Sequence, residues 1–205
     1  MNGLWEKRPS PATDTAVLSL KIPYHEPTVR TRLIHSLALH LESLSQDCRI
    51  VVVCVGTDRS TGDSLGPLVG SALARENSTL FDLYGTLDEP VHAMNLGDTL
   101  LRIMRSTQRP FVIAVDACLG QVSSVGSIQL GSGPVRPGAG VNKELPPVGD
   151  IHLTGIVNVG GFMEYFVLQN TRLNLVVKMS EIIAHSIFES VKRTRNPSIP
   201  FAMPD

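Results

Sequence analysis

The sequence predicts an α/β fold, namely a three-layer α/β/α sandwich around a mixed, mostly parallel sheet. Two continuous β-branched runs, at 49–55 and 109–117, are typical of strands that helices cover on both faces. A segment with helical spacing adjoins each run, so strands and helices alternate along the chain. The 205 residues are 42% apolar and 18% charged, which fits one globular core.

Proline content divides the chain into an arm, one domain and a tail. Residues 1–29 hold four prolines and form an arm, in which the alternating run AVLSLKI (16–22) is expected to add an edge strand. Residues 30–194 carry the periodic segments and form a single α/β/α domain. Residues 195–205 hold three more prolines and form a tail.

The first half of the domain predicts a helix, a strand and a second helix. Leucines at 33, 37, 41 and 44 follow the spacing of one helix face, starting near Thr31. The buried strand begins at Arg49 and ends at Val55. After a loop rich in small residues, helical spacing returns over 64–76. This is a strand, loop and helix unit of the kind that builds parallel sheets.

The same pattern continues along the chain. PVHAMN (90–95) is interpreted as a strand, GDTLLRIMRS (97–106) as a helix, and RPFVIAVDA (109–117) as the second buried strand. Further strands are expected at 126–131 and at 151–159, separated by a long loop rich in glycine and proline. Apolar residues at 176, 179, 183 and 187 predict a C-terminal helix.

Charge and apolar patterning exclude several classes of function. The net charge is −1 and the basic residues form no long cluster, so nucleic acid is not expected as a direct partner. The longest apolar runs have about six residues, far fewer than the roughly 20 needed to cross a bilayer. No secretory signal pattern precedes the domain, and a cytoplasmic location is expected. The three cysteines include no CxxC pair, which disfavours a disulfide framework.

Asp63 and Asp116 are the leading candidates for chemistry. Asp116 ends the buried run FVIAV, and Asp63 lies in the loop that follows the other buried strand. The carboxyl ends of neighbouring parallel strands meet at one edge of a sheet, so the two carboxylates are expected to converge. Two carboxylates held close together cannot both ionise cheaply, which supplies an acid and a base in one site. Such a pair can activate water for acyl hydrolysis.

A structural interpretation stands beside the chemical one. Asp63 comes just before a helix, where an aspartate can cap backbone N–H groups. Asp116 needs a partner if it is buried, and that partner can be a structural hydrogen bond. If Asp63 is both a cap and a chemical group, the helix N-terminus biases it toward the ionised base and leaves Asp116 as the acid.

Other residues carry weaker signals. The loop after the first buried strand lacks both the GK[ST] and GxGxxG patterns, so no nucleotide cofactor is indicated. His92 or His152 could join the two aspartates in a metal site, although core or rim histidines are commoner. Cys118 is a candidate nucleophile, with a buried structural thiol as its alternative. Asn158 is either a turn residue or an amide directed at a substrate.

Three separated motifs carry a family resemblance. VVVCVGTDRSTGDSLGPLVG, FVIAVDACLG and RPGAGVNKELPPVGDIHLTGIVNVGG resemble the YyaC-type sporulation proteins, which are similar to the germination protease of bacterial spores. That protease is an atypical aspartic peptidase with motifs such as xxDALGPxV, IAVDAL and PGSGVGNKRKEL. The resemblance covers about 29–191. It implies a phosphorylase/hydrolase-like sandwich, shared with the hydrogenase maturation endopeptidases.

The resemblance also implies roles for particular residues. Asp63 and Asp116 take the two catalytic positions, and Gly138, Gly140, Asn142 and Lys143 belong to a loop near the site, as substrate-binding candidates together with Asn158. The implied function is an aspartate-dependent peptidase of spore-forming bacteria that needs no cofactor and acts on a spore protein or peptide inside the sporulating cell or spore.

Two alternatives to this function remain open on the sequence. One is a non-catalytic spore binding protein that keeps the fold. The other is a metal-dependent maturation endopeptidase, in which Asp63, Asp116 and either His152 or His92 hold the metal. The oligomeric state is also left open, a homo-oligomer included.

Overall fold

The computed structural model describes residues 19–138 and 145–196. Its centre is a six-stranded sheet with the order β1-β5-β6-β4-β2-β3. The strands are β1 (Leu20–Pro23), β2 (Ile50–Cys54), β3 (Phe81–Tyr84), β4 (Phe111–Gly120), β5 (Ser127–Ser132) and β6 (Ile151–Val159). The pairs β3–β2, β2–β4 and β4–β6 are parallel, while β5 is antiparallel to both β6 and β1. The predicted mixed, mostly parallel sheet is confirmed.

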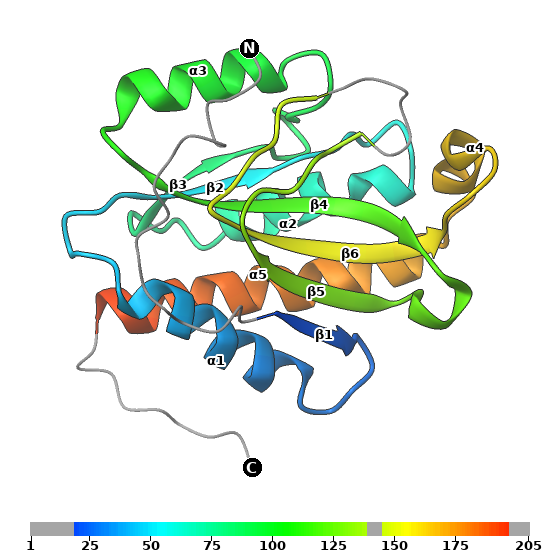
Figure 1. Ribbon diagram of the computed structural model, residues 1–205, viewed down its shortest axis with the longest axis horizontal. Coiled ribbons are helices and arrows are strands. Elements are labelled where there is room, and N and C mark those ends of the chain that lie inside the picture. Colours follow the sequence, from blue (N-terminus) through cyan, green and yellow to red (C-terminus); the bar gives the residue numbers. More distant parts are fainter. Residues whose placement is uncertain (1–18, 139–144, 197–205) are drawn as a thin grey trace.

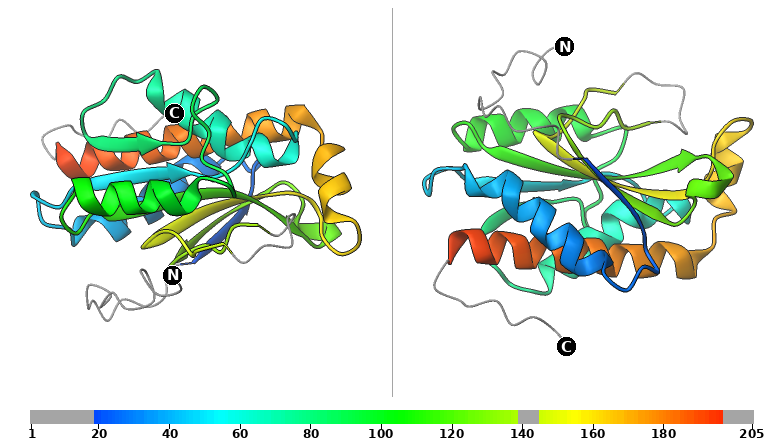
Figure 2. Two further views of the ribbon diagram at one scale, coloured as in Figure 1. Left: turned by 90° about the horizontal axis from the view of Figure 1, so that it is seen from above. Right: turned by 60° about the horizontal axis from the view of Figure 1, so that its bottom comes forward.

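Helices cover the two faces of this sheet and complete the predicted three layers (Figures 1 and 2). On one face lie α1 (Val29–Glu42), α2 (Leu65–Ala74) and α5 (Leu173–Arg195). On the other face lies α3 (Leu96–Ser106). A short helix, α4 (Glu164–Gln169), follows β6, beside the end to which the arrows of β4 and β6 point in Figure 1.

Alternation along the central strands produces two apolar cores. Ile50, Val52 and Cys54 point toward α1, α2 and α5 and are fully buried there. Val51 and Val53 point the other way and pack with Leu96, Leu100 and Ile103 of α3. Because β2 and the first half of β4 are buried on both faces, apolar residues stand at consecutive positions there, as the sequence analysis expected. None of the helices in the described ranges is long and apolar enough to span a membrane.

Most of the expected elements form. The edge strand expected from AVLSLKI appears as β1, and its Ile22 is buried in the larger core. The strand expected at 151–159 is β6 with the same bounds. The helix expected after Thr31 begins two residues earlier, at Val29. The expected tail lies outside the described residues from 197 onward.

The strand predicted at 90–95 is wrong. Only Val91 pairs there, in a single parallel bridge with Val55. Pro90 has no N–H to donate. The Asn95 side chain then accepts from the His92 N–H at 2.8 Å and donates to Pro90 O at 3.0 Å, which folds the segment into a turn. The edge strand beside β2 is instead β3, which the sequence analysis did not anticipate.

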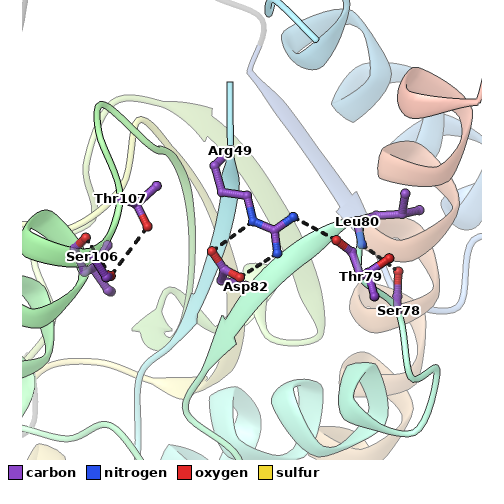
Figure 3. Close-up of polar contacts among 8 residues, drawn as sticks. Arg49, Ser78, Thr79, Leu80, Asp82, Ser106 and Thr107 are labelled. Carbon is purple, nitrogen blue, oxygen red and sulfur yellow. Dashed lines mark hydrogen bonds and ion pairs between the residues drawn. The ribbon is translucent and has the colours of Figure 1, made fainter. Parts of the chain in front are cut away.

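A charged pair joins β3 to β2 at the amino ends of these strands (Figure 3). The Arg49 guanidinium donates from Nε to Asp82 Oδ2 at 3.0 Å and from Nη2 to Asp82 Oδ1 at 2.5 Å. Its Nη1 also donates to the Thr79 carbonyl at 2.8 Å. The forked contact links β3 to the residue before β2, at the end of the sheet away from the candidate site.

Candidate functional site

A cavity of about 280 Å³ opens at the carboxyl edge of the parallel strands. Its lining includes Asp63, Asp116 and His92, together with apolar side chains from several elements. The two aspartates are therefore in one cavity, although 53 positions separate them in the sequence (116 − 63). This edge is where open α/β sheets bind ligands.

The loop between β2 and α2 sets the position of Asp63. Gly56 has φ +142°, and a Cβ there would lie 2.0 Å from the Asp63 carbonyl oxygen, so only glycine permits this close approach. The Thr57 N–H donates to that same carbonyl at 3.1 Å, and the Gly56 N–H donates to Val91 O at 2.8 Å. The loop is thus tied both to itself and to the turn that carries His92.

Asp116 is placed by strand alternation on β4. It continues the series Val112 and Ala114 on the face that α3 covers, and only 6% of its surface is exposed. Its Oδ1 accepts a hydrogen bond from the Ala117 N–H at 2.9 Å. Asp116 is in register with Thr154 of β6. A buried carboxyl group therefore lies at the floor of the cavity, with Asp63 half-buried beside it.

The electrostatics of the two aspartates differ. Burial raises the pKa of Asp116 well above its usual range, and the negative charge of Asp63 raises it further against the Ala117 hydrogen bond. Burial also raises the pKa of Asp63, but a backbone hydrogen bond from Thr57 and the charge of His92 oppose that rise. Asp116 is thus the carboxyl that holds its proton more strongly, and Asp63 ionises more easily.

Helix capping does not account for Asp63. It lies inside the 3₁₀ turn η1 (Gly62–Ser64) that precedes α2. The N-cap residues are Thr61 for η1 and Ser64 for α2, and neither makes a side-chain cap hydrogen bond. Asp63 instead lines the cavity, and the Thr57 N–H, which donates to its backbone carbonyl, lies in the same loop.

The two candidate histidines have different surroundings. His92 lines the cavity, and its Nδ1 lies 3.3 Å from the Met94 backbone nitrogen. His152 lies on β6 outside the cavity lining, and its Nδ1 is 2.9 Å from the Gly133 carbonyl. Within 19–138 and 145–196, no three His, Cys, Asp or Glu side chains are grouped so as to hold a metal ion. The metal set proposed from the sequence gains no support and stays a prediction.

The loop and amide candidates are placed unequally. Gly138 lines the cavity at φ +103°. Gly140, Asn142 and Lys143 lie outside the described residues. Asn158 is absent from the cavity lining, and its Nδ2 donates to Val167 O and Thr171 Oγ1, both at 3.2 Å. Its amide fixes the chain around α4, and a role toward the substrate stays a prediction.

Cys118 also reaches the cavity, two residues beyond Asp116. Burial raises the pKa of its thiol, and a hydrogen bond with Thr154 opposes that rise. A raised pKa disfavours the thiolate that a nucleophile needs. The structural interpretation of Cys118 is the better supported one.

Several cavity residues were missed by the sequence analysis. Tyr165 and Leu168 come from α4, and Met94 comes from the turn before α3. Ser60 also lines the cavity, and among the described residues its buried hydroxyl has no hydrogen-bond partner. α4 is six residues long and the turn is irregular, so neither segment carries a periodic signal. The run of exposed aromatics near 162–166 is the signal that could have indicated a surface.

Comparison with known proteins assigns the family. A family model described as "Protein of unknown function (DUF1256)" matches residues 21–186. The chain belongs to this family. The chain is also 64% identical over 138 residues to the protein named "Uncharacterized protein YyaC" of Bacillus subtilis (strain 168), a match that covers 67% of each chain. The predicted YyaC-type resemblance is confirmed. The likeness to the germination protease and to the maturation endopeptidases stays a prediction.

Proposed function

We propose that the protein is an aspartate-dependent peptidase that cleaves a polypeptide during sporulation or germination. The observation that carries this proposal is the meeting of Asp63 and Asp116 in one cavity, where each carboxyl has a different environment. Cleavage of an amide needs a base to activate water and an acid to protonate the carbonyl oxygen. Two unlike carboxyls in one site can provide both.

The unequal burial assigns the two roles. Asp63, the more easily ionised carboxylate, takes a proton from water as the water oxygen attacks the carbonyl carbon of the substrate. Asp116 gives its proton to the carbonyl oxygen, so the tetrahedral intermediate forms without a free oxyanion. Asp63 then gives its proton to the amide nitrogen while Asp116 takes a proton from a hydroxyl of the intermediate, so the C–N bond breaks, a carboxylic acid and an amine form, and both carboxyl groups return to their starting states. The Gly138 backbone in the cavity supports a binding role for that loop, to which we assign Gly140, Asn142 and Lys143 as well.

The link to the germination protease belongs to the same proposal. Asp63 in GDSLGPLV and Asp116 in IAVDAC take the positions of that protease's catalytic aspartates by motif. The three-layer fold with both residues at one sheet edge supports the analogy. Because one fold hosts many activities, the reaction is to be tested at these two aspartates.

The test is cleavage by purified protein in a spore extract, followed by mass spectrometry for new peptide termini. The wild type is expected to produce new termini, and Asp63→Asn and Asp116→Asn are each expected to abolish them while the circular dichroism of the fold is retained. Asp88→Asn, at an exposed carboxylate of the β3–α3 connection, serves as the matched control and should cleave like the wild type. Cleavage that survives in both single variants would refute the mechanism, and the absence of new termini with wild type would favour a binding protein.

A further inference from the structure

The residues around α4 expose several large apolar side chains next to the cavity. Phe162 is 88% exposed, and Met163, Tyr165 and Phe166 are each about half exposed. We name these four residues the α4 surface. In soluble monomers a contiguous apolar patch of this kind marks an interaction site more often than chance exposure does.

The segment that carries the α4 surface is held in place by packing against η1 and by hydrogen bonds from the end of β6. Leu168 of α4 is buried, and a Cβ added at Gly62 would lie 2.8 Å from its Cδ2, so α4 packs closely on the residue before Asp63. Thr171 Oγ1 donates to Val167 O at 2.9 Å, and Asn158 donates to the same carbonyl. The side chains are therefore exposed on a helix that is anchored to β6 and to η1.

The α4 surface is continuous with the cavity that holds the aspartates. Tyr165 belongs to both, because it lines the cavity and packs edge-to-face on Phe166 with ring centroids 5.8 Å apart. Leu168, Leu145 and Met94 add apolar walls to the same cavity. An extended chain whose backbone crosses the aspartates thus has apolar side-chain contacts both inside the cavity and on α4.

The exposed area of the α4 surface favours a polypeptide segment over a second copy of the chain as its binding partner. Three aromatics and one methionine at these exposures offer roughly 400–500 Å², about half of the ~800 Å² per partner that a stable folded interface buries. A second copy of the chain would therefore be held weakly by this surface alone. A polypeptide segment that uses the cavity as well gains the remaining contacts.

We propose that the α4 surface binds apolar side chains of a polypeptide segment that continues into the cavity. This inference rests on the proposed function for its substrate class and adds the part of the substrate that is held outside the site of cleavage. Aromatic residues on a rigid element dominate the energy of such contacts, since they bury large areas at little cost in side-chain entropy.

The test measures binding on the Asp63→Asn/Asp116→Asn background, so that cleavage plays no part in it. The probe is a fluorescein-labelled synthetic peptide with phenylalanine at alternate positions, which project to one side of an extended chain, and the second probe is the same peptide with serine in place of phenylalanine. Fluorescence anisotropy is expected to show roughly tenfold tighter binding of the phenylalanine peptide. Adding Phe162→Ser and Phe166→Ser should weaken that binding by about tenfold or more.

Leu87→Ser is the control, because Leu87 is an exposed apolar residue in the turn after β3, separated from β6 by β2 and β4. It should leave the affinity unchanged. Equal affinity for the two peptides, or binding that Phe162→Ser and Phe166→Ser leave intact, would overturn the proposal. A dimer in sedimentation equilibrium that these two substitutions dissociate would assign the surface to a second copy and also overturn it. Peptide binding as expected, without cleavage by the wild type, would refute only the peptidase.

Discussion

Replacing Asp116 by asparagine should stabilise the protein at neutral pH. The folded protein raises the pKa of this carboxyl through burial and the nearby charge of Asp63. An aspartate in an unfolded chain titrates near about 3.9. Between that value and the higher folded value, unfolding allows the group to release its proton, so the unfolded state is favoured as pH rises. Asparagine removes the proton equilibrium, and its side-chain oxygen keeps the acceptor for the Ala117 N–H.

The pKa of the aspartate in the unfolded chain sets the maximum gain in the free energy of unfolding. Each pH unit through which the folded group keeps a proton that the unfolded group has lost costs about 1.36 kcal/mol. From about 3.9 to pH 7 the cost is at most about 4 kcal/mol. In a chain of this size 1 kcal/mol corresponds to about 2–4 °C in Tm, so the variant should gain up to roughly 8–16 °C near pH 7. Below the unfolded value both states are protonated, and the gain should vanish.

Thermal and urea unfolding of wild type and Asp116→Asn over acidic to neutral pH would measure this difference. Asp88→Asn, at an exposed carboxylate, is the control and should differ from wild type by no more than about 0.5 kcal/mol at any pH. The reasoning fails if Asp116→Asn is less stable than wild type near neutral pH, or if its gain in stability does not shrink as the pH falls.

Three further predictions concern the packing and the polar contacts of the fold. Gly66→Ala should lower the free energy of unfolding by at least about 3 kcal/mol in urea, because the new Cβ would lie 2.0 Å from Val55 O. Gly97→Ala, on α3 with no atom nearby, is the control and should raise the free energy of unfolding by about 0.5–1 kcal/mol. Similar outcomes for the two variants would contradict this packing. The Arg49 and Asp82 side chains are 40% and 37% exposed, so water and salt screen their charges. A double-mutant cycle on this pair should give a coupling energy below about 1 kcal/mol that falls as salt is added. A larger coupling energy that does not change with salt would contradict this screening. Asn158→Ala should speed amide hydrogen exchange in α4 more than in α3, since two hydrogen bonds to the α4 region are lost, and uniform acceleration would count against this anchoring role.

The strands that could be predicted from the sequence are those that are buried on both faces, because such strands consist of consecutive apolar residues. Ile50–Cys54 and the first half of β4 consist of apolar residues without a break, so their state follows from local sequence. β3 is short, is interrupted by Asp82, and lies at the sheet edge, where the partner of Asp82 is Arg49, the residue before β2. The segment 90–95 has apolar residues but uses an asparagine side chain to close a turn. Local composition does not separate these two cases.

Some residues of the candidate site could likewise be predicted from the sequence, and others could not. That Asp63 and Asp116 meet could be predicted, because the ends of adjacent parallel strands share an edge. The contributions of Tyr165 and Leu168 could not, because they depend on α4 packing against Gly62, about a hundred residues earlier in the chain. Contacts of that range have no counterpart in local periodicity. The placement of His92 in the cavity likewise depends on the bridge between Val55 and Val91.

A structural role and a catalytic role of Asp116 predict opposite effects of its replacement on stability. A structural aspartate that holds the fold through charged hydrogen bonds would have a lowered pKa, and replacing it by asparagine would destabilise the protein. A carboxyl kept protonated for acid catalysis raises its own pKa at the expense of stability. The burial of Asp116 and its nearness to Asp63 raise its pKa, which is the behaviour that the proposed function predicts. A variant that gains stability near neutral pH and loses cleavage would therefore identify Asp116 as a residue that the fold retains for function.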